Sequence, residues 1–142
     1  MARGLYDRRT VLRLGAGILA TLSTAGCLSG QASSTQTITM PDNHTFEPKT
    51  ATIEAGETVR WTNESDIQHT VTAYEDEIPD EATYFASGGF ESERAARNRI
   101  SEGLIAPSEE YEHTFDHPGT YGYYCIPHES SGMVGTIRVK ER

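Results

Sequence analysis

The chain has 142 residues, which suffices for one domain with a single hydrophobic core and leaves little for a second. It carries 21 Asp and Glu against 12 Lys and Arg, a formal net charge of −9. This acidity argues against nucleic acid as a partner, because a phosphate backbone binds basic surfaces.

The first 26 residues have the features of an export signal. Arg8 and Arg9 precede an apolar run over about 14–22, and small residues follow at 24–26. A basic front, a short apolar middle and a small-residue end are typical of a secretory signal. The apolar run is shorter than the roughly 20 residues that span a bilayer. The twin arginines resemble a Tat signal, with an ordinary Sec signal as the alternative.

Cys27 follows the small residues directly, as in a lipobox, where the cysteine becomes the lipidated first residue of the mature protein. Two acyl chains on one cysteine would hold the protein at a membrane, since a single chain binds only marginally. Plain cleavage with an unused thiol is the alternative. Residues 27–37 are rich in Ser, Thr, Gly and Gln, which predicts a flexible tether. The expected location is the outer face of the cytoplasmic membrane.

After the tether, apolar and polar residues alternate with the period of β-strands, and Gly, Pro, Asn and Asp mark turns between the runs. Strands are expected at 36–40, 51–54, 58–62, 68–73, 110–115, 121–124 and 135–139. Short strands at this spacing predict an all-β domain over residues 38–142, built as a sandwich.

The stretch from Glu75 to Ser108 interrupts this strand pattern. It is acidic, and residues 91–98 contain helix formers with Glu and Arg three and four positions apart, a spacing at which side chains meet on a helix. We expect one long excursion that contains a short helix. The apolar residues expected to pin it to the sandwich are Phe85, Phe90, Ile100, Leu104 and Ile105.

Cys125, His128 and Met133 lie close together near the C-terminus. They offer a metal one thiolate, one imidazole and one thioether, and a second imidazole would complete the donor set of a blue-copper electron-transfer site. Cys27 lies at the edge of the signal and is a poor disulfide partner for Cys125. An unpaired Cys in an exported protein is unusual unless something occupies it, and a metal would do so.

The second imidazole has four candidates, His44, His69, His113 and His117. His117 belongs to a His-Pro-Gly turn, and His113 alternates with Phe115 along a strand and is expected at the surface or an edge. His44 stands in a loop of generic composition. His69 opens a strand, so a rigid sheet could aim it, and the sequence favours this residue.

Residues 36–142 resemble a type 1 copper cupredoxin of the plastocyanin and halocyanin kind. The motifs that carry the resemblance are Val59-Arg60-Trp61-Thr62-Asn63 before His69-Thr70-Val71, and Gly119 to Cys125 before Pro127-His128 and Met133. The family fold is a two-sheet Greek-key sandwich with copper near one end. The excursion and the acidity resemble halocyanins, which implies an archaeal halophile as the source.

The resemblance implies one type 1 copper ion with His69, Cys125 and His128 as equatorial ligands and Met133 as the axial ligand. It further implies a monomeric one-electron shuttle, not an enzyme, with transient contacts to membrane or soluble redox proteins. An extracytoplasmic copper carrier is the alternative. Carriers often use exposed Met- or His-rich ligands, whereas this chain has only three Met. A Cys–His nucleophile would need a third, orienting group.

The resemblance also assigns roles to neighbouring residues. The family places an Asn that ties the two ligand loops together immediately before the first ligand His. This chain departs from that pattern with Gln68, one methylene longer, so a bridge from this residue to the Cys125 loop stays open. Tyr124 matches a tyrosine along a second electron path. Asn43 and Asn63 each begin a glycosylation sequon, a short pattern that is often unused.

Overall fold

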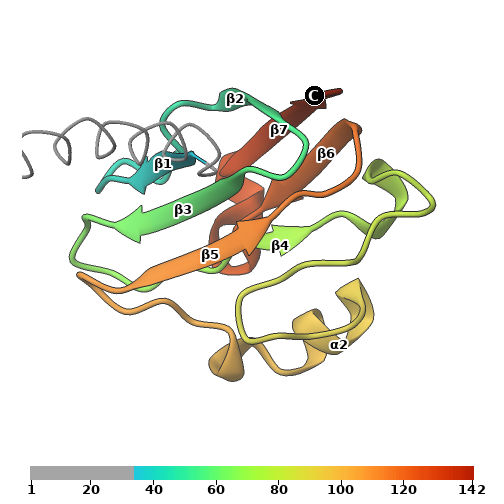
Figure 1. Cartoon of the computed structure of the whole chain (residues 1–142). Helices are drawn as coiled ribbons and strands as arrows, with labels where there is room; N and C mark the ends of the chain where they lie inside the picture. Colours follow the sequence, from blue (N-terminus) through green and yellow to red (C-terminus); the bar gives the residue numbers. More distant parts are fainter. Residues whose placement is uncertain (1–33) are drawn as a thin grey trace, which may run out of the picture. The chain divides into compact units, whose positions relative to one another are not determined.

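The structure, a computed structural model, describes residues 34–142. The predicted export signal, Cys27 and most of the predicted tether lie outside these residues. The described part forms two sheets that face each other, as Figure 1 shows, one with the strand order β1-β3-β5 and one with the order β2-β7-β6-β4. The predicted all-β, two-sheet sandwich is therefore confirmed.

Both sheets are mixed. Strand β1 runs parallel to β3 and β2 runs parallel to β7, whereas the remaining pairs are antiparallel. The strands are β1 (Thr35–Met40), β2 (Thr50–Glu54), β3 (Thr58–Asn63), β4 (Thr72–Ala73), β5 (Glu110–Thr114), β6 (Gly119–Tyr124) and β7 (Val134–Lys140). Strand β1 begins at Thr35, so residues 35–37, assigned to the tether by the sequence, pair with β3.

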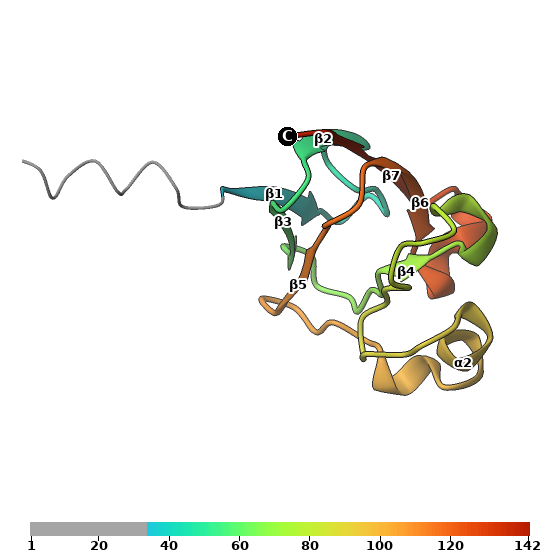
Figure 2. The ribbon, with the colours of Figure 1, turned by 45° about the vertical axis from the view of Figure 1, so that its right-hand side comes forward.

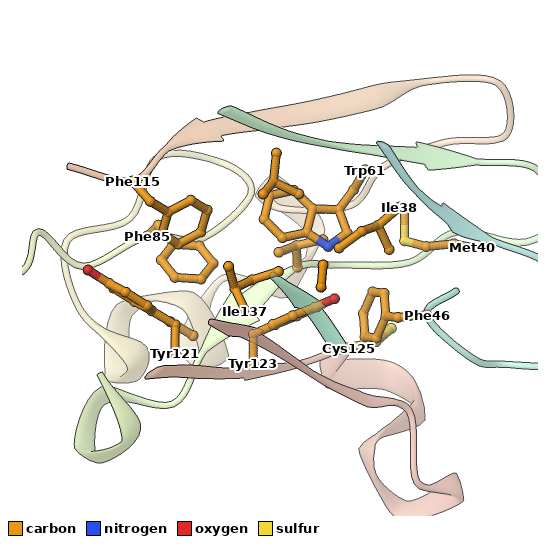
Figure 3. Close-up of a cluster of buried hydrophobic side chains, with 14 of the residues drawn as sticks. Ile38, Met40, Phe46, Trp61, Phe85, Phe115, Tyr121, Tyr123, Cys125 and Ile137 are labelled. Carbon is orange, nitrogen blue, oxygen red and sulfur yellow. The ribbon is translucent and has the colours of Figure 1, made fainter. Parts of the chain in front are cut away.

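The period-two pattern explains which side chains enter the core. In β3, Val59, Trp61 and Asn63 are buried while the residues between them are half-exposed. Figure 3 shows Trp61 from one sheet and Tyr123 from the other pointing towards each other, with ring centroids 5.4 Å apart. The same buried cluster includes Cys125. The thiol is therefore anchored in a close-packed interior.

The expected strand over 68–73 is shorter than predicted, because only Thr72 and Ala73 join the ladder as β4. The preceding backbone groups have other partners. His69 exchanges two backbone hydrogen bonds with Ile105, and Val71 N donates to Ser87 Oγ at 3.1 Å. The excursion thus takes the hydrogen bonds that a longer strand would need.

The predicted excursion contains α2 (Glu93–Asn98) between the short 3-10 helices η4 (Glu75–Glu77) and η5 (Ile100–Glu102). Ser92 caps α2 by accepting a hydrogen bond from Ala95 N. Figures 1 and 2 place α2 beside β4. None of the helices in residues 34–142 is long and apolar enough to cross a membrane.

Three of the five expected pinning residues, Phe85, Phe90 and Ile105, are buried, and Leu104 is half-buried. The expectation for Ile100 is wrong, since its side chain is 37% exposed in η5. Arg99 lies over the Phe90 ring in this region, with its guanidinium carbon 5.0 Å from the ring centroid.

Candidate metal centre

The loops that follow β3 and β6 bring His69, Cys125 and His128 together, with all their donor atoms within 4.8 Å of one another. Cys125 Sγ lies 3.7 Å from Nδ1 of His69 and 3.3 Å from Nδ1 of His128. Two donors bonded to one metal at about 2.0–2.3 Å lie roughly 3.3–3.8 Å apart. The three side chains therefore fit a single ion between them.

Met133 joins this group through the backbone of the last loop. Cys125 N donates to Met133 O at 3.0 Å, and Met133 N donates to His128 O at 3.2 Å. The 3-10 helix η6 (Ile126–Ser131) and a left-handed Gly132 carry the chain round this turn. Met133 is fully buried. This loop thus carries three of the four predicted residues, and His69 from the loop after β3 completes the donor set of type 1 copper.

The orientation of His69 is fixed by Ser65. Ser65 Oγ lies 2.9 Å from Nε2 of His69 and donates its own proton to Asn63 Oδ1 at 2.7 Å. A hydrogen bond from Nε2–H to Ser65 leaves the Nδ1 lone pair facing Cys125. Burial, assisted by the nearby His128 and His44, lowers the pKa of His69 to about 4, which favours the neutral ring that a metal binds.

Asn63 holds the loop that carries Ser65. Its side-chain nitrogen donates to Ile67 O at 2.7 Å and to Ile105 O at 2.9 Å, and the residue is buried. This sequon therefore has a structural role in the folded domain. Asn43, the asparagine of the other sequon, is exposed.

The two ligand loops are tied together by Thr70 and not by Gln68, which settles the question that the sequence leaves open. Thr70 Oγ1 accepts a hydrogen bond from Ile126 N at 2.8 Å, and Thr70 N points at Cys125 Sγ over 3.4 Å. Gln68 is exposed on the solvent side of its loop. The tie comes from the residue after the ligand His, because that residue faces the Cys125 loop.

Cys125 is a free thiol buried from solvent. Burial raises the pKa of the Cys125 thiol, and hydrogen bonds from the backbone amides of Thr70 and His128 oppose that rise. A bound cation would overcome the rise, since a metal stabilises the thiolate directly.

The structure places one further imidazole at the site. His44 stacks on His128 with ring centroids 4.2 Å apart and an interplanar angle of 22°, and its φ of 58° is left-handed. His44 is one of the four candidates for the second imidazole, but its local sequence does not predict the stack on His128. The two other candidates are elsewhere, since His113 stacks on Phe85 at 4.8 Å and His117 is exposed.

A family model of copper-binding proteins, the plastocyanin/azurin family, matches residues 33–140. The plastocyanin of Scenedesmus fuscus is 42% identical over 95 residues, which cover 67% of this chain and 86% of that protein. The chloroplastic plastocyanin of Tetradesmus obliquus is 38% identical over 95 residues, which cover 67% of this chain and 58% of that protein.

Solved structures agree with these sequence matches. The oxidised plastocyanin of the fern Dryopteris crassirhizoma superposes with a TM-score of 0.51 at 26% identity, covering 73% of this chain and 99% of that one. A purple cupredoxin from Nitrosopumilus maritimus gives a TM-score of 0.52 at 23% identity, covering 74% and 99%. The match to the purple cupredoxin, at 23% identity, supports the fold alone.

Proposed function

The chain belongs to the plastocyanin/azurin family of copper-binding proteins, and from that premise we propose that it is a blue-copper electron carrier. His69, Cys125 and His128 would be the equatorial ligands and Met133 the axial one. The observation that carries the proposal is the convergence of two imidazole Nδ1 atoms on the buried Cys125 Sγ. Copper at this site would supply a one-electron Cu(II)/Cu(I) couple.

The chain's own residues suit electron transfer better than metal delivery. His69, Cys125 and Met133 are fully buried, so they exclude water and resist ligand exchange. Backbone hydrogen bonds of Cys125 and Met133 fix their relative positions. A donor set that is held in place needs little rearrangement when the metal changes its charge. His128 is half-buried and offers the shortest route from the site to the surface.

We propose further that the protein works as a monomer at the outer face of the membrane, held by a lipid on Cys27. The support is the order of export signal, lipobox and tether in the sequence. From Cys27 onward, 8 Lys and Arg stand against 20 Asp and Glu, the acidic balance of a halocyanin-like protein. Its redox partners would bind transiently, through contacts below about 1,200 Å².

The test of the proposed function is the visible and EPR spectrum of the copper-loaded full chain. We expect an intense visible band that disappears on one-electron reduction and returns on oxidation. Cys125→Ser should be colourless, because the thiolate is the donor responsible for the band. A blue Cys125→Ser protein, or a wild-type protein that cannot be cycled between the two states, would overturn the proposal.

A further inference from the structure

Helix α2 contacts the residues on either side of the ligand segment. Tyr124 precedes Cys125, and Glu129 follows His128. Arg97 of α2 reaches both, since its guanidinium lies 4.5 Å from the centroid of the Tyr124 ring and donates to Glu129 Oε1 at 3.0 Å. Arg97 therefore contacts the residue before and the residue after segment 125–128, which carries the donors Cys125 and His128.

Two tyrosines and a second carboxylate complete the arrangement. Tyr124 Oη donates to Glu93 Oε2 at 2.9 Å, and Arg97 donates to the same oxygen at 2.8 Å. Tyr74 stacks on Tyr124 with centroids 4.2 Å apart and donates its hydroxyl proton to Glu129 Oε2 at 2.8 Å. Tyr124, expected on an electron path, is fully buried beneath these groups.

Apolar contacts extend the same interface. Ile126, the first residue after Cys125, packs against the cluster of Ala86, Phe90 and Ala96, all of which belong to the excursion. The ligand loop thus rests on the excursion through an apolar contact at its start and through Glu129 beyond His128.

An isolated surface ion pair contributes little to stability. Arg97 differs from such a pair because it contacts the carboxylates of Glu93 and Glu129 and the ring of Tyr124 at once. The members of such a network stabilise one another. The Arg97 side chain is 40% exposed, against 20% for Glu93 and 34% for Glu129, whereas Tyr124 beneath it is fully buried, so the network is shielded from solvent on its Tyr124 side.

We propose that Arg97 is a positioning residue, through which the excursion clamps the loop 126–133 against the sandwich. The clamp would hold His128 in place for the metal before copper binds and in both oxidation states. The proposal rests on the copper site proposed above, but the clamp itself can be measured without metal.

The test is Arg97→Met, which keeps an apolar stem of similar length and removes the guanidinium. Arg60→Met is the matched control. Arg60 has the same 40% exposure and pairs with Glu112 at 2.6 Å, on strands β3 and β5. Amide hydrogen exchange of residues 126–133 in the metal-free protein should accelerate roughly three- to tenfold in Arg97→Met. The rate should stay unchanged in Arg60→Met.

In the copper-loaded protein, Arg97→Met should also shift the reduction potential and release copper faster. Arg97→Lys should give intermediate values, because an ammonium group cannot match the planar guanidinium. Should Arg97→Met fail to fold, Glu129→Leu removes the accepting carboxylate from the loop side and should give the same acceleration. Exchange at 126–133 equal to that of the wild type in a folded variant would overturn the clamp. A wild type that binds no copper would instead overturn the proposed function.

Discussion

At the scale of single residues, two of the metal donors are positioned by neighbours that are not donors. Ser65 turns the ring of His69, and Thr70 ties the Cys125 loop to the His69 loop through Ile126 N. The contact of Ser65 is buried and that of Thr70 partly buried, and an unpaired polar group is costly in such places. The precision of the site therefore depends on hydroxyl groups that carry no charge and bind no metal.

Thr70→Val should reveal this dependence, because it keeps the side-chain shape and removes the acceptor for Ile126 N. We expect a loss of about 1–3 kcal/mol in the free energy of unfolding, the cost of an unsatisfied buried donor. Urea unfolding of the metal-free protein measures it. Gln68→Ala is the control and should change stability by less than about 0.5 kcal/mol. A larger loss in Gln68→Ala than in Thr70→Val would show that Gln68, and not Thr70, ties the two ligand loops.

His44 supports a separate prediction, since it combines a stacked ring with a left-handed backbone. His44→Ala should lose the stack, about 0.5–1.5 kcal/mol, and keep the backbone strain. His44→Gly should also lose the stack but relieve about 1–2 kcal/mol of strain. Copper release to a chelator should accelerate equally in both variants, while thermal unfolding should show the glycine variant to be the more stable. Unchanged copper release would show that the stack does not support His128.

At the scale of elements, the turn from η6 into β7 decides where Met133 lies. Gly132 ends η6 with φ at 88°, and a Cβ there would meet nothing within 4 Å. Gly135, three residues on in β7, differs, since a Cβ there would lie 2.5 Å from the Tyr123 ring. The first glycine is required by backbone conformation, and the second by packing.

The two glycines should therefore respond differently to alanine. Gly132→Ala should cost about 1–2 kcal/mol, the cost of a left-handed L-residue, with the core intact. Gly135→Ala must move the ring of Tyr123, and overpacking of this kind costs about 1–3 kcal/mol. Fluorescence of Trp61, which packs on Tyr123, should change in Gly135→Ala only. A changed Trp61 signal in Gly132→Ala would contradict this division.

At the scale of the whole molecule, local sequence patterns explain the strands and the short helix. Apolar and polar residues alternate along the strands, and Glu and Arg stand three and four positions apart in the helix. The Cys125, His128 and Met133 cluster is local in the same sense. The sequence favours His69 because it is expected to open a strand, whereas β4 begins only at Thr72 and His69 is held by its backbone hydrogen bonds to Ile105. Thr70, His44 and Arg97 could not be predicted, because their contacts join loops more than 30 residues apart. The shortness of β4 could not be predicted for the same reason, since the backbone groups before it form hydrogen bonds with distant residues of the excursion.

Metal binding should stabilise the whole domain, because the donors converge only when the two sheets and the two ligand loops are folded. A ligand that binds the folded state alone, at a thousand times its dissociation constant, adds about 4 kcal/mol to the free energy of unfolding. Copper should therefore raise the melting temperature of the wild type, and a strong chelator should reverse the rise. Cys125→Ser should melt near the metal-free wild type and gain little from copper. An equal gain in Cys125→Ser would mean that copper stabilises the protein from another place, since the buried thiol is the donor on which both imidazoles converge.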